Sequence, residues 1–240
     1  MFPRRSRSPR RTDDVARPDD LTRELDAVAG AQPAPAPYPV ERLADALPQL
    51  TAVVGPPGAS TTELLAQLAG ALGPTPLVLV DPKGDASALV ARHADPAAVE
   101  ASVTPRGPSA IHEVLMTVSA AASGAVVLVD CADLLWSTEA EREQFADYLR
   151  TLRMRDHRVV LGVHRPGDLP PLPRPELWCV FPGAGYPDRA WAREAPEVSA
   201  AGAFARDPRW NGWLNCMVVS EEGDVFGVVE VGPEPQMPPR

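Results

Sequence analysis

The sequence predicts an α/β fold, a mostly parallel sheet flanked by helices, from three observations. Nearly continuous apolar runs, such as those at residues 76–80 and 125–129, are typical of parallel strands buried on both faces. Segments with apolar residues at helical spacing alternate with these runs. Several runs end in an acid or a polar residue, which is where open α/β sheets bind their ligands. At 240 residues and 45% hydrophobic content, the chain has room for one such domain with tails.

The ends of the chain differ in composition from its middle. Residues 1–39 comprise a basic arm, with five arginines and no acid in its first eleven residues, and a Pro-rich linker. The arm has little apolar surface to bury, so we expect disorder, apart from a short helix at 21–29. It could contact DNA or another acidic partner, or act only as a solubilising tail. The domain is predicted at 40–232 and a Pro-rich tail at 233–240. The net charge of −9 argues against a protein that coats nucleic acid.

Cysteine usage and hydropathy indicate the compartment. Cys131, Cys179 and Cys216 stand far apart within apolar runs, which fits buried free thiols better than zinc ligands or disulfides. No apolar run approaches the roughly 18 residues of a membrane span, and the N-terminus lacks the apolar region of a signal peptide. We therefore expect a cytoplasmic protein without a membrane span.

The segment at 51–72 has the strand-loop-helix order of a phosphate-binding loop. A short helix at 40–47 leads into a strand at 51–54, and Leu64, Leu65, Leu68, Ala69 and Leu72 fall on one face of the following helix. The working pattern is G-x-x-x-x-G-K-[ST], whose backbone N–H groups hold phosphates. Gly55 and Thr62 keep their places in it, whereas Ser60 replaces the second Gly and Thr61 the Lys. The predicted nucleotide-binding loop comprises Gly55, Pro56, Pro57, Gly58, Ala59, Ser60, Thr61 and Thr62. The alternative is a proline-capped turn that opens an ordinary helix.

Two buried strands then end in acids. The run at 76–80 ends at Asp81, shortly before Lys83, and a helix at 111–122 follows. The run at 125–129 ends at Asp130, in the pattern of a carboxylate that holds Mg²⁺ through water. The next residue in an active enzyme of this type is usually a Glu that polarises water, and here it is Cys131.

The remaining elements complete the sheet. Thr138 and Glu141 predict a capping box at the start of a helix whose buried stripe is Phe145, Leu149 and Leu152. Strands are expected at 158–163, directly before His164, and at 177–181. Two apolar runs at 213–219 and 225–231 flank a polar turn, which predicts an antiparallel hairpin at one edge.

Three segments resemble, in order and spacing, the core motifs of the FtsK/HerA superfamily: LVDPKGD at 79–85, VDCADLL at 129–135 and RDHRVVLGVHRP at 155–166. Members of that superfamily are RecA-like P-loop ATPases that move DNA or protein, including translocases, packaging ATPases and type VII secretion ATPases. The resemblance spans about residues 50–182. It implies a RecA-like P-loop core, bound ATP and Mg²⁺, and a homo- or hetero-oligomer with a motor ATPase that acts on DNA.

The resemblance also implies roles for individual residues. Thr62 and Asp130 would lie on the Mg²⁺ side, His164 takes the place of a sensor Gln, and Arg155 lies near the position of a trans-acting Arg in some members. Apart from the resemblance, the position of Asp81 and Lys83 at the end of the strand beside the loop predicts that they border the nucleotide, and Lys83 could supply the positive charge that the loop lacks.

The departures from the superfamily pattern affect activity. Thr61 and Cys131 remove charge neutralisation and water activation, two separate contributions to phosphoryl transfer. This predicts weak or absent ATP hydrolysis. The alternatives are a silent pseudo-ATPase that partners an active paralogue, and a scaffold that keeps only the fold. On the scaffold interpretation, Asp81 and Asp130 merely end strands and His164 is a loop histidine bonded to backbone.

Overall fold

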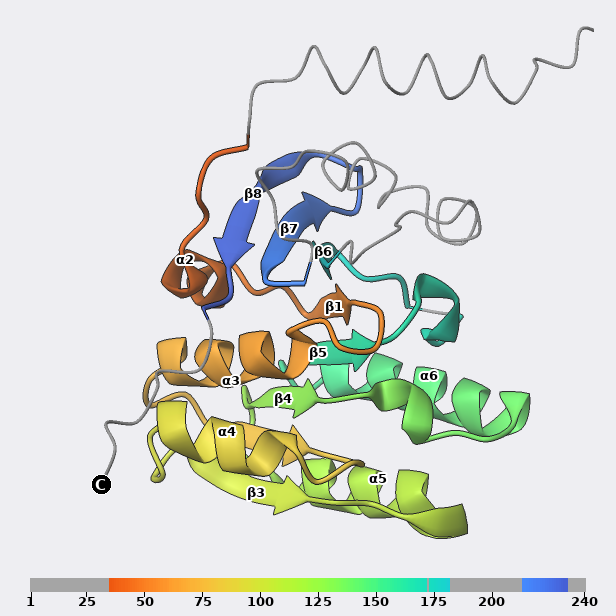
Figure 1. Ribbon diagram of the computed structural model, residues 1–240. Coiled ribbons are helices and arrows are strands. Elements are labelled where there is room, and N and C mark those ends of the chain that lie inside the picture. Colours follow the sequence, from red (N-terminus) through yellow and green to blue (C-terminus); the bar gives the residue numbers. More distant parts are fainter. Residues whose placement is uncertain (1–34, 172, 182–212, 233–240) are drawn as a thin grey trace, which may run out of the picture. The chain divides into compact units, whose positions relative to one another are not determined.

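The computed structural model describes residues 35–171, 173–181 and 213–232 of the chain (Figure 1). Eight strands of the described part form one sheet in the order β3-β2-β4-β5-β1-β6-β7-β8. Their bounds are β1 Leu50–Val54, β2 Leu77–Val80, β3 Val99–Val103, β4 Val126–Val129, β5 Arg158–Val163, β6 Leu177–Val180, β7 Asn215–Ser220 and β8 Val225–Glu230. Strands β1 to β6 pair in parallel, and β7 and β8 add an antiparallel hairpin beside β6. The predicted fold class is confirmed.

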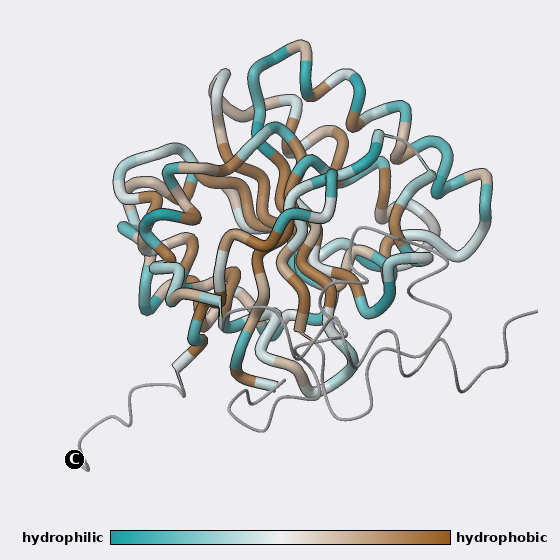
Figure 2. Tube along the Cα trace, turned by 90° about the horizontal axis from the view of Figure 1, so that it is seen from above, coloured by the Kyte–Doolittle hydropathy of each residue, from teal (hydrophilic) through white to brown (hydrophobic). Residues whose placement is uncertain are grey.

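Helices cover both faces of the sheet. Helices α2 Val40–Asp45, α3 Thr61–Ala71 and α4 Ala86–His93 bury their apolar side chains in one core with Val126, Leu128 and Val160. Helices α5 Ala110–Ala120 and α6 Glu139–Arg153 share the other core with Val127, Val129 and Leu161. Figure 2 shows the apolar strands in the middle, between helices whose outward residues are hydrophilic. Alternate side chains of each strand therefore enter opposite cores, as the pleat of a strand requires.

Strand order decides which residues share an edge. Strand β5 lies between β1 and β4, so the ends of all three strands meet, with Val54 opposite Val163 and Val129 opposite Leu161. The Gly55 N–H donates to the Val163 carbonyl at 3.1 Å, and the Asp130 N–H to the Val80 carbonyl at 2.9 Å. Gly55, Asp81, Asp130 and His164 each directly follow one of the parallel strands, so they lie at the same end of the sheet.

Local sequence signals account for most element ends. Thr138 caps α6, and its hydroxyl accepts the Glu141 N–H while the Glu141 carboxylate accepts the Thr138 N–H, so the predicted capping box is present. The structure adds two elements that the sequence analysis did not predict, α4 and β3. The burial of β3 alternates along its length because it is an edge strand, so it lacks the apolar run that marks the central strands. The predicted helix at 21–29, the basic arm and the C-terminal tail lie outside the described residues.

The segment just before α2 is attached to the hairpin. Pro37 forms a bridge with Val228, and the Tyr38 N–H donates to the Val228 carbonyl at 2.8 Å. A Cβ on Gly227 would come within 2.6 Å of the Ala36 carbonyl oxygen, so this close approach needs glycine.

All three cysteines are buried and free, as predicted. None of the helices described is both long and apolar enough to span a bilayer.

Candidate functional site

The predicted phosphate-binding loop connects β1 to α3, and its backbone donors are partly used by the protein. The Ala59 N–H donates to the Pro56 carbonyl at 2.9 Å, and the Ser60 N–H to the Trp213 carbonyl at 3.0 Å. Prolines have no N–H to offer. Within the described residues, Gly58, Thr61 and Thr62 keep N–H groups without an acceptor. These donors and the positive end of the α3 dipole are available to a phosphate group.

Gly55 fixes the geometry of the loop. A Cβ at this position would lie 2.8 Å from Thr61 Cγ2, 2.9 Å from Ala59 Cβ and 3.1 Å from Phe181 Cβ. We expect Gly55→Ala to lower the free energy of unfolding by about 1–3 kcal/mol, because the loop must shift to relieve these contacts. Urea denaturation measures this. Gly232→Ala is the matched control, since nothing lies within 4 Å of its added Cβ. Equal stabilities of the two variants would contradict the packing argument.

Thr62 and Asp130 meet across the site. The Thr62 hydroxyl lies 3.2 and 3.3 Å from the two carboxylate oxygens of Asp130, although the residues are 68 positions apart in the chain. Asp130 is fully buried, and burial raises the pKa of its carboxyl, as does the nearby charge of Asp81, while the Thr62 hydrogen bond lowers it. A hydroxyl and a carboxylate at a helix N-terminus are oxygen donors of the kind that bind Mg²⁺ together with phosphate oxygens and water.

Cys131 occupies the place of the expected glutamate. Its backbone is left-handed, with φ 48° and ψ 53°, its thiol lies 3.6 Å from Asp130 Oδ2, and it is 5% exposed. Burial and the charge of Asp130 raise the pKa of the thiol to about 12, so Cys131 is neutral at pH 7. A neutral thiol is a weak proton acceptor, and Cys131 therefore does not replace the carboxylate.

Lys83 reaches the same group of residues from the end of β2. Partial burial lowers the pKa of its ammonium, but the neighbouring Cys131 side chain and the charges of Asp130 and Asp85 raise it, and the net direction is upward. Lys83 therefore stays protonated and places a positive charge beside Asp130, where the loop itself has Thr61 instead of lysine.

Asp81 is engaged by its own turn. Its carboxylate accepts the Gly84 N–H at 2.7 Å, the Ser87 N–H at 2.8 Å and the Ser87 hydroxyl at 2.9 Å. The side chain is fully buried. These three bonds position Lys83 and the start of α4, which is a structural contribution to the site.

His164 follows β5 and pairs with a residue that the sequence analysis did not select. His164 Nδ1 lies 2.7 Å from Asp133 Oδ2, and Asp133 belongs to a short 3₁₀ turn, Ala132–Leu134, directly after β4. The loop-histidine alternative expected a backbone partner, and the structure shows a carboxylate instead. Asp168 lies nearby, and burial, together with the charge of Asp133, raises the pKa of its carboxyl. The sequence marks His164 because it directly follows a strand. It does not mark Asp133 in this way, because three residues separate Asp133 from the end of β4.

Arg155 does not join this group. It precedes β5, whereas His164 follows it, so the two residues lie at opposite ends of one strand. Its guanidinium donates to the Ser119 carbonyl at 2.8 Å. A role toward a neighbouring subunit stays a prediction for this residue.

One comparison with known proteins finds a similar fold. The fold is similar to that of the genome packaging NTPase B204 from Sulfolobus turreted icosahedral virus 2, whose structure was solved in complex with AMP. The TM-score is 0.51 at 13% identity, over 74% of this chain and 95% of that one. This likeness shows the fold. No protein-family model matches the sequence, and no curated protein matches it.

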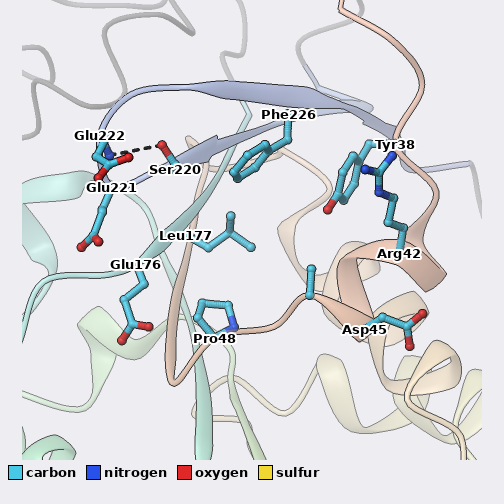
Figure 3. A pocket seen from close by; sticks show the side chains of 11 residues that line it. Tyr38, Arg42, Asp45, Pro48, Glu176, Leu177, Ser220, Glu221, Glu222 and Phe226 are labelled. Atoms are coloured by element: carbon cyan, nitrogen blue, oxygen red, sulfur yellow. Dashed lines mark hydrogen bonds between the residues drawn. The ribbon is translucent and has the colours of Figure 1, made fainter.

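A cavity of about 530 Å³ lies near the N-terminal ends of β1 and β6, whereas the phosphate-binding loop follows the C-terminal end of β1 (Figure 3). Its lining includes Tyr38, Arg42, Pro48, Leu177, Glu221 and Phe226. The guanidinium of Arg42 lies 4.9 Å from the centre of the Tyr38 ring. None of the predicted site residues lines this cavity, so it is separate from the phosphate-binding loop.

Proposed function

We propose that this chain is a nucleotide-binding protein of a DNA translocation or packaging motor, with ATP bound at residues 55–62 and weak or absent hydrolysis. The contact between the Thr62 hydroxyl and the Asp130 carboxylate carries the proposal. It joins the start of α3 to the end of β4 and provides oxygens that can bind Mg²⁺, which in turn binds nucleotide phosphates. The likeness to a genome packaging NTPase supports the choice of motor.

Mg²⁺ would be held by Thr62 and Asp130. No group of three or more His, Cys, Asp or Glu side chains in the described part could hold a metal ion. The ion would therefore complete its shell with phosphate oxygens and water, as Mg²⁺ commonly does. Mg²⁺ would neutralise phosphate charge, and Lys83 would add to that effect from the end of β2.

Slow hydrolysis follows from the two replaced residues. Thr61 brings no charge to the phosphates, and Cys131 brings a neutral thiol where a carboxylate would activate water. Both groups would act in the transition state, so losing both lowers turnover more than binding.

A second candidate is a silent subunit that partners an active paralogue in an oligomer. The donors of Ala59 and Ser60 favour it, because the protein's own carbonyls already occupy them. Both candidates are proposed as cytoplasmic, which the three buried free thiols support.

Calorimetric titration with ATP, with and without Mg²⁺, tests nucleotide binding. We expect saturable binding that is tighter with Mg²⁺ and is weakened by Asp130→Asn. Absence of ATP binding under both conditions would overturn the proposal and leave the scaffold interpretation. Binding without turnover in the isolated chain, with turnover on adding an active partner, would favour the silent subunit.

The basic arm predicts salt-dependent DNA binding. Deleting residues 1–20 removes six arginines and should flatten the slope of log affinity against log salt by up to about 5, because each phosphate contact releases about 0.9 counterion. Fluorescence anisotropy with a labelled duplex over a series of salt concentrations measures the slope. Deletion of residues 233–240 is the control and should change the slope by about 1 at most, since that tail has one arginine. An unchanged slope after the arm deletion would assign the arm another role.

A further inference from the structure

We infer that Asp133 and His164 form the water-activating pair of this site, in place of the carboxylate missing at position 131. The inference rests on the proposed nucleotide binding. His164 Nδ1 and Asp133 Oδ2 are 2.7 Å apart, and the two side chains are 24% and 17% exposed. The pair is therefore mostly shielded from water, yet the imidazole is accessible to a ligand.

The backbone conformation explains why Asp133, two residues after position 131, can act in place of a carboxylate at that position. Cys131 is left-handed and the 3₁₀ turn Ala132–Leu134 follows, so the chain turns sharply after Asp130. This turn places Asp133, three residues after Asp130, beside the end of β5. His164 itself comes directly after Val163, whose carbonyl accepts the Gly55 N–H. The pair therefore stands next to the first residue of the phosphate-binding loop.

The pairing defines how the imidazole can act. An ionised carboxylate only accepts hydrogen bonds, so Nδ1 carries the proton that Asp133 accepts, and in the neutral ring Nε2 then keeps its lone pair. The described residues give Nε2 no partner. Asp133 Oδ1 is buried and also lacks a partner in that part of the chain. The other charged groups close to this pair are Asp168 and Arg165.

In the step we infer, a water oxygen forms a bond to the terminal phosphorus of a nucleoside triphosphate. The bond from that phosphorus to its bridging oxygen breaks, and the electron pair stays on the nucleoside diphosphate. The water proton passes to His164 Nε2, and inorganic phosphate leaves. Asp133 is a positioning residue that holds the ring and stabilises the imidazolium.

Variants separate this role from a merely structural one. His164→Ala should lower ATP turnover at least about tenfold while ATP affinity changes by less than about twofold. Imidazole added to His164→Ala should restore part of the turnover. Added imidazole should not restore Asp133→Asn, because that variant keeps its own ring. His112→Ala is the control, since His112 is exposed on α5, and it should leave turnover unchanged.

A spectroscopic readout does not depend on turnover. Proton–nitrogen NMR of the full chain should show His164 with its proton on Nδ1, and Asp133→Asn should shift or exchange-broaden that signal. Failure of wild type to bind ATP would overturn the proposed function and this inference with it. Three results would overturn the inference alone: ATP binding with no wild-type turnover, turnover unchanged in His164→Ala, or loss of turnover without imidazole rescue in a folded variant.

Discussion

The double variant Ser60→Gly/Thr61→Lys should bind MgATP roughly 10- to 100-fold more tightly than wild type. It restores a lysine beside the phosphates, and a hydrogen bond to a charged group contributes about 1.5–3 kcal/mol, which corresponds to that range of affinity. The lysine accounts for most of the gain. Ser60 has φ −78° and ψ 42°, a conformation that does not require glycine. Ser60→Gly alone is therefore the matched control, and calorimetry should show less than about a threefold change.

Turnover of this double variant should rise less than its ATP affinity, because position 131 still lacks a carboxylate. Cys131→Glu should add activity only on the repaired loop, because charge neutralisation and water activation act as one site and their effects do not add. The glutamate must fit a left-handed, buried position beside Asp130, which limits the gain. Steady-state assays of wild type, each repair and the combination measure this. Brisk wild-type turnover abolished by Asp130→Asn would show that the site is active as it stands, and Lys83 would then be the first residue to test as the source of the missing charge.

Asp81→Ala should lower the free energy of unfolding by about 3 kcal/mol or more. The change removes a buried acceptor of three hydrogen bonds and leaves the Gly84 and Ser87 N–H groups to find water. Asp85→Ala is the control, because Asp85 precedes α4 without a side-chain capping bond, and it should change stability by less than about 0.5 kcal/mol. Urea denaturation followed by circular dichroism compares the two. A stable Asp81→Ala variant that loses ATP binding would show instead that Asp81 contacts the nucleotide.

The central strands were predictable from the sequence, and the edges were harder. Continuous apolar runs identified β2, β4 and β5 because both of their faces are buried, and Thr138 with Glu141 identified the start of α6. Strand β3 was missed because alternate burial gives a short mixed sequence. The order of the strands is a tertiary property, and no local pattern places β5 between β1 and β4.

Site residues that directly follow a strand could be predicted from the sequence. Asp130 and His164 were found because each directly follows a strand. Asp133 was not found, because its approach to His164 depends on the left-handed turn at Cys131, and cysteine gives no sequence signal for positive φ. The use of the Ala59 and Ser60 N–H groups was not predicted either, because their acceptors, the Pro56 and Trp213 carbonyls, are set by the folded chain.

The hydrogen bond from Ser60 to Trp213 connects the loop to the segment that enters the antiparallel hairpin. An N–H that donates to a carbonyl is not free for an incoming phosphate oxygen, so a phosphate that took the Ser60 donor would break this hydrogen bond. Binding free energies are reciprocal. A partner that drew Trp213 away would therefore raise the affinity of the loop for phosphate by the same factor by which phosphate favoured that partner. Phosphate binding at the loop and partner binding at residue 213 would thus be coupled through this one hydrogen bond.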